Sequence, residues 1–183
     1  MSKRFRDSLP SDWLKYLVVA VVVVFLWVWA FDLYHDPKDT EKISLFFAGE
    51  VKSASDFEES AKKEFPYLKS VGVSSAHPDT GNAFKQKYSS VALVYADVVI
   101  VTETVAGQTK CSTFFTEWSG SGEPYVQEEH TYGAYLSEEA TEKLSAYFIF
   151  NASERYVVFA VAASVNAGEK TDHAIQFMEW LLK

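Results

Sequence analysis

The stretch Asp97-Val98-Val99-Ile100-Val101-Thr102 decides the fold, because it is the clearest strand in the sequence. Its residues are β-branched almost throughout, and such residues favour strands. An apolar run without polar alternation is typical of a strand that is covered on both faces. The stretch therefore predicts a central strand of a sheet with helices on both sides.

The segments before this strand alternate between strand and helix patterns. Residues 43–48 form an apolar run typical of a buried strand, and residues 71–75 indicate a second short strand. Between them, a capping-box pattern that starts at Ser55 predicts a helix to about Phe65. A further helix is expected over residues 82–91. This alternation predicts right-handed crossovers and parallel strand pairs.

The strand patterns of the second half lie closer together and are less regularly separated by helices. They cover residues 132–136, 147–150 and 155–165, and a last helix is expected over 169–181. We therefore predict an α/β fold, a three-layer domain over residues 43–183 with a mixed, mainly parallel sheet. The expected core includes Phe46, Phe57, Phe65, Val99, Ile100, Phe159, Phe177 and Trp180.

A separate apolar stretch, WLKYLVVAVVVVFLWVWAF, occupies residues 13–31. Its nineteen residues would rise ~28 Å as a helix, about the thickness of a bilayer's hydrocarbon core. Tryptophan and tyrosine residues lie at both of its ends, as in membrane-spanning helices. The stretch predicts an uncleaved transmembrane signal anchor over residues 13–34, followed by a polar linker at 35–42. A cleaved signal peptide, the alternative, would have a shorter apolar run and a small-residue cleavage site.

The charges beside this stretch predict its orientation. Four basic residues precede or open it: Lys3, Arg4, Arg6 and Lys15. The positive-inside rule then places residues 1–12 in the cytoplasm and the domain outside the cell. The sequence thus predicts a single-pass protein of the cell membrane, with the lipid bilayer as the partner of residues 13–34.

The composition excludes some partners. The formal net charge is −8, which argues against nucleic acid, because nucleic-acid binding needs a basic surface. The one cysteine, Cys111, cannot form an internal disulfide. Cys111 is expected to be a buried small residue on a helix rather than a reactive thiol.

No catalytic or metal-binding pattern is recognisable in the sequence. The GxSxG, GxGxxG and phosphate-loop motifs are absent. The four histidines have no metal-ligand spacing. We predict no catalytic residues, no metal site and no cofactor, so the chain is not expected to be an enzyme.

The candidate ligand site is positional. In open α/β sheets, ligands bind beyond the carboxyl ends of the parallel strands. The residues at those ends are Gly49, Ser74, Ser75, Thr102 and Glu103. Their small side chains and hydroxyl groups could hold a small polar ligand, and the Glu103 carboxylate a cationic or hydroxylated group. Ordinary turns, which favour the same residue types, are the alternative.

Three parts of the chain resemble extracytoplasmic solute-binding proteins of the type II periplasmic-binding fold. They are KISLFF at 42–47 followed by FEESAKKEFP at 57–66, ADVVIV at 96–101, and DHAIQFMEWLL at 172–182. The chain looks most like the small, membrane-anchored, single-lobe relatives in Gram-positive bacteria. The resemblance implies a single lobe of the periplasmic-binding-protein type.

These observations predict a membrane-anchored extracytoplasmic binding or interaction module. It would be an accessory or sensing component of a membrane assembly, such as a transporter, with a membrane protein as partner. The alternative is a single-lobe solute-binding protein that captures a small polar ligand. A cell-envelope enzyme is the least supported alternative.

Overall fold

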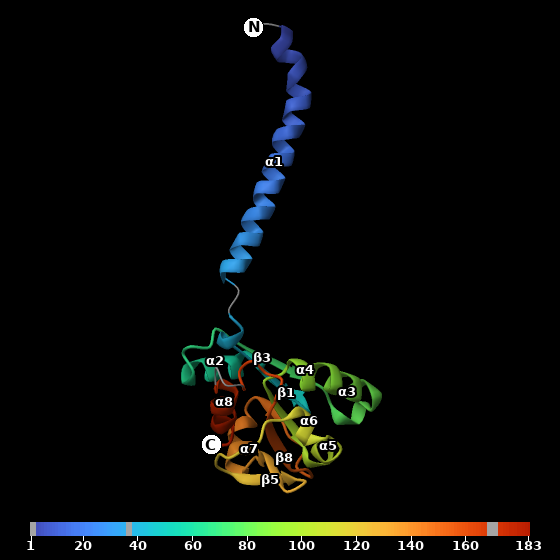
Figure 1. The fold of residues 1–183 in the computed structure, drawn as a ribbon, viewed down its shortest axis with the longest axis vertical. Helices are drawn as coiled ribbons and strands as arrows, with labels where there is room; N and C mark the ends of the chain where they lie inside the picture. Colours follow the sequence, from blue (N-terminus) through green and yellow to red (C-terminus); the bar gives the residue numbers. More distant parts are fainter. Residues whose placement is uncertain (1–2, 36–37, 168–171) are drawn as a thin grey trace. The chain divides into compact units, whose positions relative to one another are not determined.

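The computed structural model describes residues 3–35, 38–167 and 172–183. The chain divides into two compact units, Met1–Asp36 and Pro37–Lys183. The described part of the first unit is one helix, α1 (Lys3–His35), and the second unit holds the sheet and the other helices (Figure 1). Of the predicted linker at 35–42, residues 36 and 37 lie outside the described residues, and residues 39–41 form a 3-10 turn, η1 (Asp39–Glu41).

The membrane prediction needs correction. Among the described residues, none of the helices has both the length and the apolar character required to cross a membrane. The charge-free run within α1, residues 16–31, has sixteen residues. It would rise only ~24 Å, which is less than the ~30 Å of a bilayer's hydrocarbon core. The prediction of a transmembrane signal anchor at 13–34, and with it the single-pass topology and the cell-membrane location, is therefore wrong.

The second unit is built on a six-stranded sheet of order β3-β1-β4-β8-β6-β5. The strands are β1 (Lys42–Phe47), β3 (Ser70–Ser75), β4 (Val98–Thr102), β5 (Glu123–Gln127), β6 (His130–Tyr135) and β8 (Tyr156–Ala160). β1 pairs in parallel with β3 and β4, whereas the β4–β8, β8–β6 and β6–β5 pairs are antiparallel. The α/β class and the mixed sheet are confirmed. The prediction of mainly parallel pairing is wrong. The strands of the second half, β5, β6 and β8, pair antiparallel, and antiparallel pairs do not need a crossover helix between their strands.

A smaller antiparallel pair joins β2 (Glu50–Val51) and β7 (Phe148–Ile149). The helices of this unit are α2 (Ala54–Glu64), α3 (Asn82–Lys87), α4 (Leu93–Tyr95), α5 (Glu103–Gly107), α6 (Cys111–Phe114), α7 (Glu138–Leu144) and α8 (His173–Leu181). Two shorter pieces are the 3-10 turn η2 (Pro78–Thr80) and the π-helical segment η3 (Tyr88–Ala92). The N-cap of α2 is Ser53 rather than Ser55, since the Ser53 Oγ atom accepts from the Asp56 amide. The expected start of the last helix, at 169–171, lies outside the described residues.

Two apolar cores cover the two faces of the sheet. Leu45 and Phe47 of β1 pack in one core, which α2 and α8 complete. Phe46, which points the opposite way, packs in the other core with residues of α3, η3 and α6. Figure 1 shows α2 and α8 on one side of the sheet and the α3–α6 helices on the other. The predicted core residues are buried except Trp180, which is partly buried.

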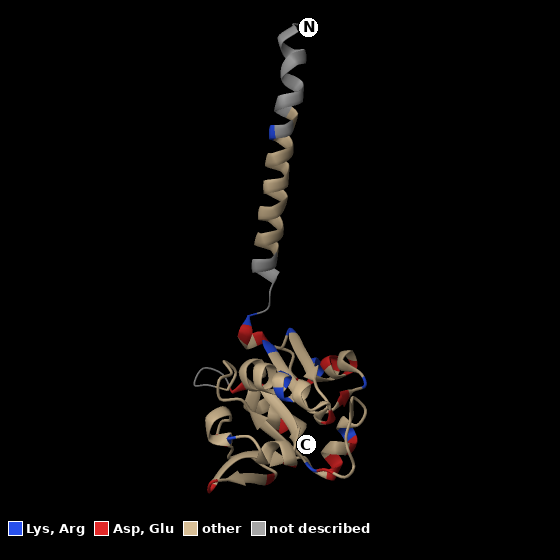
Figure 2. Cartoon of the chain, turned by 90° about the vertical axis from the view of Figure 1, so that its right-hand side faces the viewer, with Lys and Arg blue, Asp and Glu red and all other residues tan. Residues whose placement is uncertain are grey.

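The strand that decided the prediction is the most deeply placed one. All five residues of β4 are buried, as expected for a strand with helices on both faces. Figure 2 shows the acidic and basic segments mainly on the helices and turns that surround the sheet. Cys111 is buried at the start of α6, as predicted. Burial raises the pKa of its thiol to about 11, so the thiol is protonated at neutral pH.

A buried polar cluster lies at the amino ends of β1 and β4. Asp97 accepts hydrogen bonds from the Ser44 amide (2.7 Å), the Ser164 hydroxyl and the Asn166 Nδ2 atom (3.1 Å). Asn166 Nδ2 also donates to the carbonyl oxygens of Lys42 (2.9 Å) and Asp39 (3.2 Å). β8 ends at Ala160 and not at 165 as expected. Beyond it, Val161 forms an isolated antiparallel bridge with Phe115, and Ser164 and Asn166 bond Asp97.

Gly133→Ala in β6 is expected to destabilise the protein by about 2–3 kcal/mol, because the strand packs too closely for a side chain. A Cβ at Gly133 would lie 2.4 Å from the Val158 carbonyl oxygen and 2.7 Å from the Phe159 ring. Urea unfolding of the full chain measures the change in unfolding free energy.

The matched control for Gly133→Ala is Gly107→Ala at the end of α5. A Cβ there meets no heavy atom within 4 Å, and the change is expected to be neutral or stabilising by up to about 1 kcal/mol. Similar unfolding free energies for the two variants would show that β6 does not pack on β8 as described.

Candidate functional site

Two of the five predicted site residues line a common cavity. Gly49 and Thr102 border a cavity of about 220 Å³ beyond the carboxyl ends of β1 and β4. Glu50, Asn151 and Glu154 also line this strand-end cavity. The position agrees with the rule for open α/β sheets, and ligand binding at these residues stays a prediction.

Ser74 and Ser75 do not line the strand-end cavity. They pair with Phe46 and Phe47 along the β3–β1 ladder. The Ser74 hydroxyl donates to the Leu45 carbonyl oxygen (3.5 Å), and the Ser75 carbonyl accepts from the Lys87 Nζ atom (2.6 Å). Both serines therefore have structural partners on the β3 side of the sheet.

Glu103 also lies outside the strand-end cavity, in a separate polar chain at the start of α5. Its Oε1 atom accepts a hydrogen bond from the Tyr135 hydroxyl (2.7 Å). The Arg155 guanidinium stacks 3.8 Å from the centre of the Tyr135 ring and binds Glu123 (2.5 Å). Burial and the Glu103 hydrogen bond raise the pKa of Tyr135 to about 12, so this hydroxyl stays a donor. The Glu103 carboxylate, which was predicted to bind a ligand, is therefore already hydrogen-bonded to Tyr135.

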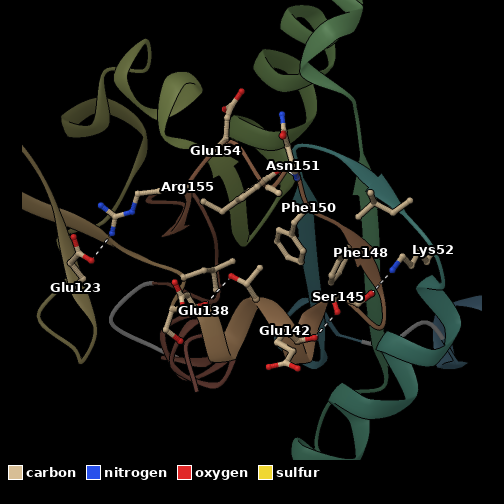
Figure 3. Close-up of a pocket in the computed structure, with 16 residues that line it drawn as sticks. Lys52, Glu123, Glu138, Glu142, Ser145, Phe148, Phe150, Asn151, Glu154 and Arg155 are labelled. Carbon is tan, nitrogen blue, oxygen red and sulfur yellow. Dashed lines mark hydrogen bonds and ion pairs between the residues drawn. The ribbon is translucent and has the colours of Figure 1, made fainter.

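A cavity of about 790 Å³ lies between α7, β7 and the turn at 150–155. We call it the α7 cavity. Three aromatic residues line it, Phe148, Phe150 and Tyr156. Figure 3 shows the Phe150 ring pointing into the space above α7. Phe150 is held by edge-to-face contact with Tyr156, with 4.9 Å between ring centres.

The charges around the α7 cavity are unbalanced. Both cations that line it are engaged: Lys52 Nζ donates to the Ser145 carbonyl oxygen (2.6 Å), and Arg155 binds Glu123. The cavity is also lined by Glu138, Glu142 and Glu154. Among the described residues, no hydrogen bond or ion pair reaches these three carboxylates, and the Glu154 Oε2 atom is buried without a partner. The cavity therefore carries an excess of negative charge next to aromatic rings.

Local hydrogen bonds place these side chains. The N-cap of α7 is Ser137, whose Oγ accepts from the Ala140 amide (3.1 Å). The turn after β7 is closed by the Asn151 amide, which donates to the Tyr156 hydroxyl (3.0 Å). The Asn151 Oδ1 atom in turn accepts from the Ser153 amide (3.0 Å). Together these bonds set Glu138 on one side of the cavity and the 150–155 turn on the other.

The sequence analysis did not predict α7, and it therefore missed Glu138 and Glu142, the two carboxylates of this helix that line the α7 cavity. A signal was present, because a serine followed by Glu138 and Glu139 is a typical helix start, with acidic residues near the positive end of the helix dipole. No local pattern marks Glu154, which lies in a turn and reaches the cavity only through the fold.

Comparisons of the chain with protein-family models, with curated proteins and with solved structures find no match. The interpretation of the site therefore rests on its own geometry and charge.

Proposed function

We propose that the Pro37–Lys183 unit is a binding module for a small ligand that carries a cationic amino group. The ligand would lie in the α7 cavity, whose volume of about 790 Å³ is in the usual range for small-molecule sites, ~300–1,000 Å³. One observation carries the proposal. Among the described residues, three carboxylates without a cation partner line an aromatic-lined cavity that has two cations, of which Arg155 is already paired with Glu123.

The chemistry of the lining favours a cation over other ligands. A hydrogen bond to a charged group contributes about 1.5–3 kcal/mol, and a cation beside an aromatic ring adds about 0.5–2 kcal/mol. An anionic ligand would meet repulsion from Glu138, Glu142 and Glu154. Among the described lining residues, Lys52, which binds a neutral carbonyl oxygen, is the one cation without a carboxylate partner. A neutral ligand would gain no charge attraction from these carboxylates, of which Glu138 and Glu142 are exposed.

The apolar surface of this unit gives less support to a docking role. Its exposed large apolar side chains are spread over separate elements: Tyr67, Val94, Tyr95, Val126, Ile149 and Val165. Docking surfaces are contiguous patches of several hundred Å². The sequence resemblance to single-lobe solute-binding proteins also implies ligand capture, and it stays a prediction.

A series of compounds that share one alkyl chain tests the charge preference. We expect n-butylamine to raise the melting temperature of the full-length protein, and n-butanol and butyrate to leave it unchanged at constant ionic strength. Ligand at ten times its Kd stabilises the folded state by about 1.4 kcal/mol. The double change Glu138→Gln and Glu142→Gln should remove most of the shift caused by the amine.

Glu139→Gln is the matched control, since Glu139 lies on the same helix and binds Lys143 (3.0 Å) rather than lining the cavity. It removes one charge from α7 and should keep the full shift. Equal stabilisation by all three compounds, or equal shifts in the control and the double variant, would show that the cavity does not bind a cation.

A further inference from the structure

The α7 cavity and the strand-end cavity share a wall. The residues that line both are Ile149, Phe150, Asn151, Glu154 and Tyr156. In Figure 3 the Glu154 and Asn151 side chains extend from this wall away from α7. One set of side chains therefore faces two neighbouring spaces of about 790 Å³ and 220 Å³.

Glu154 is the charged member of the shared wall. Its side chain is half-buried, and its Oε2 atom is buried without a hydrogen-bond partner. A carboxylate oxygen that has lost water and gained no partner is costly, and a cation bound beside it would offset that cost. The described residues supply no such cation, so a ligand is the group that could.

Each cavity also has a carboxylate of its own. Glu138 and Glu142 line the α7 cavity, and Glu50 lines the strand-end cavity; all three side chains are exposed. Among the described residues Glu50 has no ion pair. Asp79, which also lines the strand-end cavity, has its Oδ2 atom 3.4 Å from the His77 Nδ1 atom. Carboxylates thus lie in both spaces and in the wall between them, with Phe150 at the same wall.

We infer that the ligand is a linear di- or polyamine whose chain passes along the shared wall from one cavity to the other. The inference rests on the proposed function and adds the class of ligand. One amino group would lie near Glu138 and Glu142, another near Glu50, with Glu154 between them. The methylene chain would pack on Phe150, because apolar segments between charges gain from leaving water.

The number of amino groups is the variable to test. We expect isothermal titration of the full-length protein with n-butylamine, putrescine and spermidine to give a Kd that falls about tenfold with each added amino group, the effect of one further charged hydrogen bond. Glu50→Gln should weaken spermidine about tenfold and leave butylamine unchanged. The titrations are done at a constant ionic strength near 0.15 M, because salt screens the non-specific attraction between the amines and this negatively charged protein.

The control and the contrary outcomes separate the two proposals. Glu139→Gln removes the same charge outside both cavities and should change none of the three affinities. Equal affinities for the three amines, or a Glu50→Gln variant that behaves like the control, would overturn the inference. If Glu138→Gln still weakened butylamine in that case, the proposed function would stand. Failure of all three amines to bind would overturn both.

Discussion

Val99→Asp is expected to prevent stable folding of the sheet unit. Val99 is fully buried in β4 and packs in the core formed with Phe46 and Phe159. An aspartate there would bury a charge without a partner, at a cost of about 4–5 kcal/mol or more. Folded domains are stable by only ~5–15 kcal/mol in total. Circular dichroism and urea unfolding of the full chain would show loss of the cooperative transition.

Val126→Asp provides the comparison for Val99→Asp. Val126 lies on the edge strand β5 and is 54% exposed, so its replacement should change the unfolding free energy by no more than about 0.5 kcal/mol. If Val99→Asp unfolded at the same urea concentration as Val126→Asp, the assignment of β4 as the central buried strand would be wrong.

Asn166→Asp is expected to destabilise the protein by about 3 kcal/mol at neutral pH, although it changes only one atom of the side chain. The two N–H hydrogens of the Asn166 Nδ2 group are shared among three oxygen atoms, on Asp39, Lys42 and Asp97. Aspartate would replace this donor by an acceptor and would add a second carboxylate beside Asp97. The loss of two N–H donors costs about 2 kcal/mol, and the repulsion between the two carboxylates adds to this cost.

The loss in Asn166→Asp should depend on pH. Burial and the Asp97 charge would raise the pKa of the new carboxyl above its unfolded value. When the pKa of a carboxyl group is higher in the folded than in the unfolded state, its contribution to stability is fully present below the unfolded pKa. That contribution is lost as the pH rises through the folded pKa. The deficit relative to the parent chain should therefore be smaller at about pH 4 than at about pH 7.

Urea unfolding at both pH values measures this dependence. Asn151→Asp is the control, since Asn151 is exposed and its Oδ1 atom only accepts a bond, from the Ser153 amide. An Asn166→Asp deficit that matched the control, or that did not change with pH, would show that the buried cluster does not hold the sheet's end.

The sequence by itself determined the elements whose information is local. The β-branched run at 97–102 and the apolar run at 43–48 became β4 and β1, because a strand buried on both faces needs continuous apolar side chains. Of the five residues predicted at the strand ends, Gly49 and Thr102 line one cavity, and ligand binding there stays a prediction. The apolar run at 13–31 shows the limit of local patterns, since hydropathy indicated a membrane span that the described helix does not provide.

Only the tertiary structure decided the pairing of the second half and the make-up of the site. β8 inserts antiparallel between β4 and β6, and no periodicity states which strand lies beside which. Glu138, Glu142 and Glu154 line one cavity because α7 and the turn at 150–155 lie on either side of it. Asn166 bonds Asp97 across 69 residues of chain. Such contacts join segments that are far apart in sequence, so their geometry exists only once the chain has closed around the sheet.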